Sequence, residues 1–398
     1  MAGRDRTFTC GLRVHSGVGL VDRNFPDHLE ELLLRAALVE DLSASDAWRA
    51  WLAETGGLDR CEWATHRVLP LVYRNLAAQR GPQPEFERLK GLYRRNWYLN
   101  QRLLRDAEDI LAAMNAAGIE TMVLKGTSLI ARYYEDQGVR PMGDLDVLVR
   151  ADAVPRAMQV LLAEGWLPVD DTPLKRLAVT QHAVSHVRAD RIEVDLHWDL
   201  APRRWRNDVW TGALAIEIGG VPTAALSPPL NLLHILTHGI RPFGQPLGWV
   251  SDAITIIRNG DMAWDDFIDA VVVEQPGPRL LAALVYLRAT FSAPIPSYVV
   301  QQLGQADLGG MAERLADWAV GHDIRHGSAY PEYYVQWRRL QETDNDLQLP
   351  RGYVEYVQWI WKTSSRWGLG IRLFRKAWQI ARFGKSHPSG VAVCQDSA

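Results

Sequence analysis

The stretch LKGTSLIARYYEDQGVRPMGDLDVLV, residues 124–149, decides the fold that we expect for this chain. It joins a glycine-containing turn, residues 125–128, to a short apolar segment that carries two alternating aspartates, Asp144 and Asp146. Successive side chains of a β-strand point to opposite faces, so these two carboxylates would share one face while the apolar residues enter a core. Two carboxylates at this spacing suit a hard cation such as Mg²⁺, which takes its remaining ligands from water and phosphate.

The turn Lys125-Gly126-Thr127-Ser128 is the second feature of this stretch. We expect it to open a helix over 127–135, because the residues that follow are apolar at helical spacing. The backbone N–H groups at such a helix start can bind phosphate. The sequence therefore predicts a phosphate-binding turn next to a divalent-metal site.

The neighbouring sequence predicts that this stretch belongs to an α+β module. The expected elements are a strand over 119–124, a strand over 144–149, a helix over 152–164 and a hairpin with strands over 182–188 and 192–198. In the last strand Glu193, Asp195 and His197 share one face, and the apolar residues between them share the other. Mixed strands and helices of this kind predict an α+β core over residues 118–215.

Helical periodicity dominates on both sides of this module. The expected helices cover 27–53, 62–78 (bent or broken at Pro70), 85–117 (capped by Gly118), 230–238, 247–258, 264–273 and 278–291. The resulting division is a flexible arm (1–25), an N-terminal helical domain (26–117), the α+β core (118–215), a helical domain (216–300), a helical region rich in aromatic and basic residues (301–385) and a disordered tail (386–398).

Composition is that of a globular protein without a strong global charge. The chain has 398 residues, of which 47% are hydrophobic and 23% charged, with a formal net charge of −3, so no basic field points to nucleic acid. Cys10, Cys61 and Cys394 lie far apart in the sequence, so neither a disulfide framework nor a zinc-binding spacing is present. This cysteine usage is typical of a protein in the reducing cytoplasm. No apolar run reaches the roughly 18 residues of a membrane span, and none follows Arg4 and Arg6, so we also expect no signal peptide.

Several segments together resemble a known family. They are residues 124–128, residues 140–149, the strand segment 194–198, the helix 69–76, and the helix pair that carries His238, Trp249 and Asp252. These segments are similar to the uncharacterised bacterial nucleotidyltransferase family within the polymerase-β-like superfamily. The resemblance covers residues 30–270, and it implies a polymerase-β-like nucleotidyltransferase core, a mixed sheet with flanking helices, embedded between largely helical domains.

The resemblance also implies a reaction and the residues that perform it. A nucleotidyl group would move from an NTP to a hydroxyl group, with release of pyrophosphate, through two Mg²⁺ or Mn²⁺ ions. Asp144 and Asp146 would be the catalytic, metal-binding pair, and Asp195 would be the third carboxylate. The residues expected to bind the NTP are Lys125, Gly126, Thr127, Ser128, Arg140 and His197, with Arg140 neutralising phosphate charge and His197 in the wall of the site. The favoured acceptor is a small molecule, a peptide natural product or a protein, and RNA is the alternative.

This chain departs from the superfamily pattern near the turn. Thr127 follows the glycine where Ser or Gly is usual, and the gap to Asp144 is longer than usual. The contacts that hold the phosphates are therefore left open by the sequence.

Two other functions remain open from the sequence. The first is a catalytically inactive scaffold with the same fold, against which the presence of all three carboxylates counts. The second is a tRNA-modifying toxin, which would need a basic groove along the N-terminal helical domain. The arginines available for such a groove are Arg94, Arg95, Arg102 and Arg105. The basic segment 362–385 is expected to be a solvated helix face, with a tethering surface as the alternative.

Four histidines and one aspartate have simpler structural interpretations. His234 and His238 stand four residues apart on an expected helix, a spacing that can bind metal, but core packing is favoured. His182 and His186 share a strand face and could line the site or serve structure. Asp252 is expected to pair with a buried base.

Overall fold

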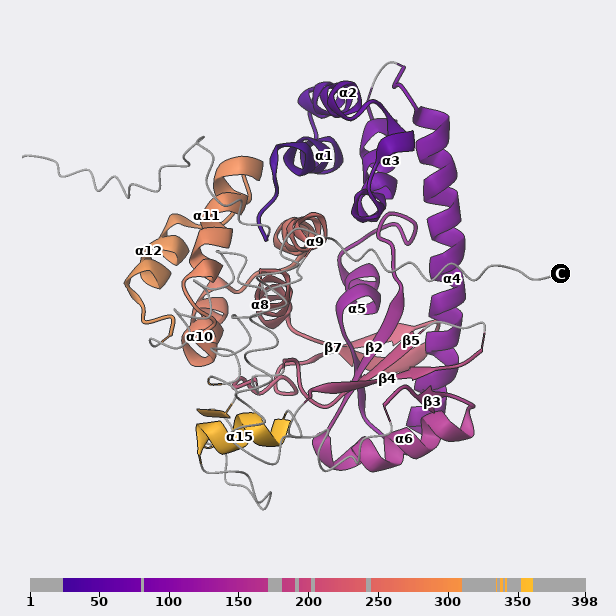
Figure 1. Ribbon diagram of the computed structural model, residues 1–398, viewed down its shortest axis with the longest axis vertical. Helices are drawn as coiled ribbons and strands as arrows, with labels where there is room; N and C mark the ends of the chain where they lie inside the picture. Colours follow the sequence, from indigo (N-terminus) through magenta and orange to yellow (C-terminus); the bar gives the residue numbers. More distant parts are fainter. Residues whose placement is uncertain are drawn as a thin grey trace, which may run out of the picture.

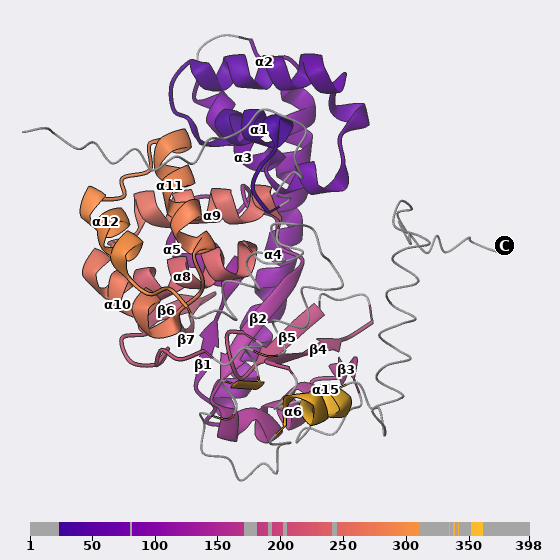
Figure 2. The same cartoon turned by 60° about the vertical axis from the view of Figure 1, so that its left-hand side comes forward.

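The structure is a computed structural model that describes residues 24–79, 82–170, 181–189, 193–201, 205–240, 245–309 and 352–360, with isolated positions at 334, 337, 338 and 341. A mixed sheet lies at one end of a long helix, and helical layers lie above and beside it (Figures 1 and 2). The α+β class predicted from the sequence is confirmed. The predicted basic segment 362–385 and the predicted tail lie outside the described residues.

The sheet of the described residues has seven strands in the order β3-β4-β5-β2-β1-β7-β6. The strands are β1 (Thr121–Val123), β2 (Asp144–Val149), β3 (Leu167–Pro168), β4 (Ala183–Val187), β5 (Glu193–His197), β6 (Leu214–Ile218) and β7 (Val221–Ala225). β2 pairs in parallel with β5, and β1 in parallel with β7, whereas the other neighbours are antiparallel. Because β2 and β5 run in parallel, Asp144 and Asp146 of β2 lie beside Glu193 and Asp195 of β5.

The N-terminal helices are shorter than predicted. They are α1 (His28–Leu38), α2 (Ser43–Thr55), η1 (Leu58–Arg60), η2 (Trp63–Arg67), α3 (Leu69–Ala77) and α4 (Phe86–Ala116). The single helix expected over 27–53 is wrong, because Val39 adopts an extended conformation and ends α1. The helix expected over 62–78 begins as a short 3-10 helix, and α3 starts just before Pro70, since proline lacks an N–H group and is tolerated in a first turn.

The remaining helices agree with the sequence more closely. They are α5 (Lys125–Arg132), α6 (Val154–Ala163, preceded by the 3-10 helix Ala151–Ala153), α8 (Pro228–Gly239), α9 (Pro246–Asn259), α10 (Trp264–Glu274), α11 (Arg279–Phe291), α12 (Ser297–Gln305) and α15 (Tyr353–Ile360). The described part of the chain contains no helix with the length and apolar character needed to cross a membrane.

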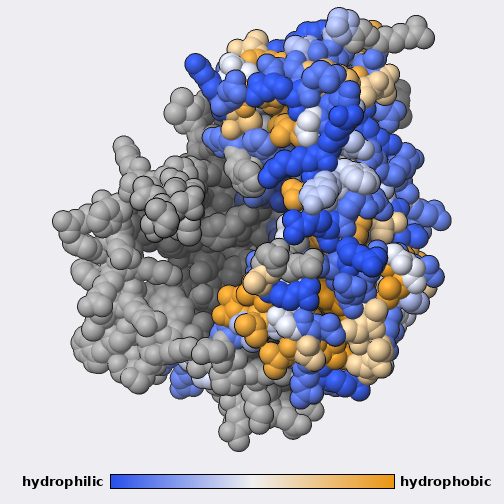
Figure 3. Space-filling model, turned by 90° about the vertical axis from the view of Figure 1, so that its right-hand side faces the viewer, coloured by the Kyte–Doolittle hydropathy of each residue, from blue (hydrophilic) through white to orange (hydrophobic). Residues whose placement is uncertain are grey.

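Two large apolar clusters hold this architecture together. One packs the sheet against α4 and α6, through residues such as Leu111, Val147 and Leu196. The other joins α1, α3, α8, α9 and one side of α5, where Leu129 and Ile130 are buried. The side of the molecule on which α4 lies is mainly hydrophilic (Figure 3). The start of α5 and the start of β2 face residues of α8 and α9 across one pocket.

Candidate active site

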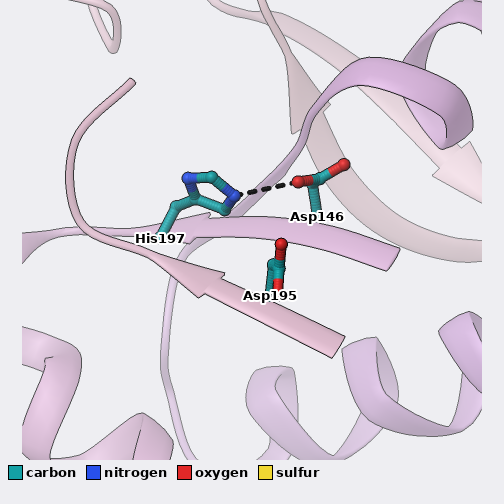
Figure 4. Close-up of side chains that lie close together, drawn as sticks. All are labelled: Asp146, Asp195 and His197. Atoms are coloured by element: carbon teal, nitrogen blue, oxygen red, sulfur yellow. Dashed lines mark hydrogen bonds and ion pairs between the residues drawn. The ribbon is translucent and has the colours of Figure 1, made fainter. Parts of the chain in front are cut away.

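Three acidic side chains from two neighbouring strands come together at one place. Asp144 and Asp146 are the first and third residues of β2, and Asp146 is the direct Cα partner of Asp195 on β5. One ligand atom each from Asp146, Asp195 and His197 lies within 4.8 Å of the other two. Figure 4 shows the Asp195 carboxylate and the His197 ring, both from β5, directed toward Asp146, with the His197–Asp146 contact drawn as a dashed line. The structure thus brings Asp146 and Asp195 together, whereas Asp144, at the start of β2, is not part of this cluster, in which His197 is the third member.

Asp146 is enclosed by charged and polar groups and is 1% exposed. Its Oδ1 atom accepts hydrogen bonds from Lys125 Nζ at 2.7 Å and from His197 Nε2 at 2.9 Å. Burial alone would raise the pKa of this carboxyl, but the Lys125 ammonium and the His197 hydrogen bond hold the pKa well below its usual range. Asp146 is therefore an anion. Burial opposes the charge of Lys125 too, yet Asp146 raises the pKa of that ammonium above its ordinary value.

Asp144 and Asp195 add negative charge beside this ion pair. Asp144 reaches the surface, but the surrounding protein removes part of its hydration. This loss of water, and then the negative charge of Asp146, raise the pKa of Asp144 above the ordinary value. Asp195 is partly buried and accepts a hydrogen bond from Ser185 Oγ at 2.6 Å. The carboxylates outnumber the single ammonium of Lys125, so the site has a surplus of negative charge. Carboxylate oxygens in this number fit a hard divalent cation.

The glycine-containing segment belongs to the first turn of α5 and does not precede the helix as predicted. α5 begins at Lys125, two residues earlier than expected. Lys125 has a φ of 41°, in the region that non-glycine residues seldom occupy. The side chains of Thr127 and Ser128 are buried, where they contact Met142 and Asn231. The Ser128 backbone N–H donates to the Leu124 carbonyl oxygen at 3.4 Å, so neither side chain, nor this N–H group, is left for a phosphate.

Arg140 forms an ion pair within the protein, whereas the sequence predicts that it neutralises phosphate charge. Its Nε and Nη2 atoms donate to the two carboxylate oxygens of Asp252, at 2.7 and 2.8 Å, and both side chains are buried. The Tyr134 hydroxyl donates to the same carboxylate at 2.9 Å. Burial acts against the charge of Arg140, but Asp252 raises its pKa above the ordinary value. The expectation that Asp252 pairs with a buried base is confirmed. Arg140 Nη1 donates to the Pro141 carbonyl oxygen at 3.5 Å and faces Gly126, where an added Cβ would lie 2.8 Å away.

A pocket of ≈ 320 Å³ opens beside the carboxylates. Its wall includes Lys125, Gly126, Arg140 and Asp144 from the predicted set, together with residues of η2, α8 and α9. Arg67, His238 and Gln245 are lining residues that the sequence did not assign to the site. No local motif marks them, since only the packing of the helical domains against the core brings them there.

A larger crevice of ≈ 920 Å³ lies between α4, the end of α5 and the β6–β7 hairpin. None of the described residues that line it belongs to the predicted site. The smaller pocket is the candidate active site, because Asp144, Lys125 and Arg140 line it and the cluster of Asp146, Asp195 and His197 adjoins it through Lys125, whereas no predicted site residue lines the crevice.

The remaining histidines are mostly part of the protein interior. His186 and His234 are both 1% exposed, and burial lowers the pKa of each, well below the ordinary value for His234. The ring of His182 contacts that of His197, with centroids 5.4 Å apart. Among the described residues, only Asp146, Asp195 and His197 form a cluster of three metal-capable groups. The structure thus favours core packing for His234 and gives the His234–His238 pair no third ligand.

Comparisons with known proteins extend this description. No curated protein matches the sequence. Two solved structures are similar to part of the chain. The solution structure of the antibiotic-resistance factor ANT(2'')-Ia has 13% identity and a TM-score of 0.31, over 51% of this chain and 96% of that chain. The crystal structure of an antigenic nucleotidyltransferase-like protein from Paracoccidioides brasiliensis has 18% identity and a TM-score of 0.34, over 50% of this chain and 96% of that chain.

A family model described as an uncharacterised nucleotidyltransferase matches residues 62–292. This range contains η2, the whole sheet and helices α3 to α11, and with them every residue of the candidate site. The protein therefore belongs to this family of nucleotidyltransferase enzymes.

Proposed function

We propose that the protein transfers a nucleotidyl group from an NTP to a hydroxyl group of an acceptor, with release of pyrophosphate. The observation that carries this proposal is the pairing of Asp146 with Asp195, beside Asp144 and a pocket lined by cationic side chains. This arrangement supports a reaction in which a polyphosphate and a divalent cation meet at the edge of the sheet.

Asp144, Asp146 and Asp195 would hold the cation, Mg²⁺ or Mn²⁺. When bound, such an ion neutralises charge on the phosphates and lowers the pKa of a coordinated hydroxyl. His197 donates a hydrogen bond to Asp146 and so fixes the direction of that carboxylate. Lys125, whose Nζ now pairs with Asp146, would exchange this partner for a phosphate oxygen when a cation arrives. His197 would thus orient a ligand, and Lys125 would bind the NTP.

The reaction forms one bond and breaks one. The acceptor oxygen attacks the α-phosphorus, and the bond from that phosphorus to its bridging oxygen breaks, so pyrophosphate leaves with the bonding electrons. The proton of the acceptor hydroxyl passes to a carboxylate. Asp195 is the candidate for this base, since it is partly buried and Ser185 holds one of its oxygens.

The acceptor that we favour is a small molecule, a peptide natural product or a protein in the cytoplasm. The pocket volume and the formal net charge of −3 support this choice. One observation supports RNA instead. Four arginines of α4, namely Arg94, Arg95, Arg102 and Arg105, have exposed side chains, as a tRNA-modifying enzyme would need. RNA binding that weakens steeply with salt would favour that alternative.

The test is transfer of label from each of the four NTPs, labelled at the α-phosphorus, with Mg²⁺ or Mn²⁺ and a cell lysate as the source of acceptor. We expect label in an acceptor fraction for the wild type and a loss of about 10³-fold in Asp195→Asn. Asp152→Asn, an exposed carboxylate outside the site, is the matched control and should retain activity. Label transfer by Asp195→Asn at the wild-type rate would overturn the proposal.

A further inference from the structure

Arg67 is a cationic residue of the pocket that comes from outside the α+β core. It is the last residue of η2, and its side chain lines the same pocket as Lys125, Gly126 and Arg140. Its Nη1 atom donates a hydrogen bond to Gln245 Oε1 at 3.2 Å, and the side chain is exposed to solvent. The guanidinium group can therefore reach a ligand in the pocket.

A glycine of α9 makes room for this side chain. A Cβ added at Gly248 would lie 2.8 Å from Arg67 Nε and 3.3 Å from Arg67 Cδ. Gly248 lies in the first turn of α9, where alanine would be the better helix former. The close approach of Arg67 thus gives a physical reason for glycine at this position.

The charge of Arg67 has no acidic partner among the described residues. The described ion pairs of the pocket join Lys125 to Asp146 and Arg140 to Asp252, whereas the hydrogen-bond partner of Arg67 is the neutral amide of Gln245. Although Arg67 reaches solvent, loss of water around its guanidinium in the pocket and then the neighbouring Arg140 lower its pKa, whereas the nearby Asp252 and Asp144 act in the opposite direction. Two guanidinium groups that face one pocket can together bind an anion with more than one charge.

We propose that Arg67 binds the β- and γ-phosphates of the NTP. This inference rests on the proposed function, because the carboxylates of β2 and β5 fix where the α-phosphorus must lie. The rest of the polyphosphate then extends along the pocket, past Lys125 and the start of α5, toward Arg67 and Gly248. Arg67 carries a charge and five donors in a planar fork, which suits two neighbouring phosphate groups. The N-terminal helical domain thereby contributes directly to substrate binding and to charge stabilisation on the leaving pyrophosphate.

The experiment is calorimetric binding of inorganic tripolyphosphate and of an NMP to the full-length chain, without metal and again with Mg²⁺. Arg67→Ala should weaken tripolyphosphate binding about tenfold or more, and should leave NMP binding within about twofold of the wild type. Arg67→Lys should recover part of the loss, because it restores the charge without the planar fork. Gly248→Ala should weaken tripolyphosphate binding as well, since it displaces the guanidinium.

The controls separate this inference from a folding defect and from the proposed function. Arg60→Ala removes an exposed arginine of η1 in the same domain and should bind tripolyphosphate as the wild type does. Unfolding temperatures verify that each variant is folded. If tripolyphosphate binds equally well to Arg67→Ala and the wild type, or fails to bind the wild type, the inference is overturned even where label transfer occurs. If Arg67→Ala selectively loses tripolyphosphate while no acceptor is ever labelled, the inference stands and the proposed function fails.

Discussion

Two ion pairs, each with a buried carboxylate, border the pocket, and they differ in what surrounds them. Arg140 and Asp252 form a bidentate pair, with Tyr134 as a further donor to the same carboxylate. Lys125 and Asp146 are joined through one oxygen, with His197 on that same atom. The first pair is saturated with donors, whereas the second lies beside two more carboxylates. Each pair thus has a buried carboxylate, and the Lys125–Asp146 pair differs by the surplus negative charge beside it.

This difference separates a structural pair from a reactive one. The Arg140–Asp252 pair joins the segment before β2 to α9, so it fixes the core against the wall of α8 and α9. In the proposed function the Lys125–Asp146 pair exchanges its ammonium for a divalent cation, because Asp144 and Asp195 add negative charge that one ammonium does not balance. Substitutions at the two pairs should therefore affect different properties, namely catalysis at the Lys125–Asp146 site and folding stability at the Arg140–Asp252 pair.

The largest expected effect is on catalysis, in Asp144→Asn. We expect label transfer to fall about 10³-fold, or about 4 kcal/mol, because the variant removes a carboxylate proposed to hold the cation. Its folding stability should be unchanged or slightly higher, since the protein raises the pKa of Asp144 and so disfavours its anion. Transfer assays and thermal unfolding measure the two effects. A variant that unfolds readily would contradict the assignment of Asp144 to chemistry.

The second effect is on stability, in Asp252→Ala. Removal of one partner leaves Arg140 buried and unpaired, which costs about 3–5 kcal/mol of unfolding free energy. Denaturant unfolding measures this loss. The double variant Arg140→Met with Asp252→Leu should recover most of it, since no charge is then left buried. An Asp252→Ala protein as stable as the wild type would show that the pair does not hold the two elements together.

A third and smaller effect compares two glycines, one of which faces the Arg140 side chain while the other does not. In Gly126→Ala the new Cβ would meet Arg140 Nη1 at 2.8 Å and Met142 Cγ at 3.0 Å, whereas in Gly143→Ala it would meet nothing within 4 Å. Because Asp252 holds Arg140 in place, Gly126→Ala should lose about 1–2 kcal/mol of stability. Gly143→Ala should change it by less than about 0.5 kcal/mol. Equal stabilities in denaturant would mean that Arg140 can move aside.

The smallest effect is a slope in stability against pH, which His234 should contribute. Burial lowers its pKa well below the ordinary 6.5, so between 6.5 and the folded-state pKa the unfolded chain takes up a proton that the folded protein does not. Stability should therefore fall as the pH drops below 6.5, by up to about 1.4 kcal/mol per pH unit, and be unaffected by this group above it. His234→Leu should flatten that part of the profile. An unchanged acid slope in the variant would contradict a neutral, buried His234.

The places of the carboxylates on their strands could be predicted from the sequence, because they depend on the alternation of side chains along a strand. The alternation of Asp144 and Asp146, and of Asp195 and His197, follows from the period of a strand, which places each pair on one face.

The β6–β7 hairpin was missed although its signal is present. Apolar alternation on either side of Gly219 and Gly220, both with positive φ, is typical of a tight hairpin.

Other parts of the site could not be read from local pattern. The Lys125 backbone adopts a positive φ that its residue type does not favour, so the helix starts before the glycine and not after it. The contact of His197 with Asp146 depends on the parallel pairing of two strands that are far apart in sequence. Arg67 enters the pocket only because η2 packs against α9, and tertiary packing of that kind leaves no local signal.

The central claim is that Asp144, Asp146 and Asp195 together hold a divalent cation, and direct titration with Mn²⁺ tests it. Electron paramagnetic resonance of Mn²⁺ can follow binding to the wild type and to Asp195→Asn, with and without an NTP analogue that cannot react. We expect saturable binding by the wild type, strengthened by the analogue, and affinity at least about tenfold weaker in Asp195→Asn. Equal affinity of the two proteins for Mn²⁺, in the presence of the analogue, would contradict it.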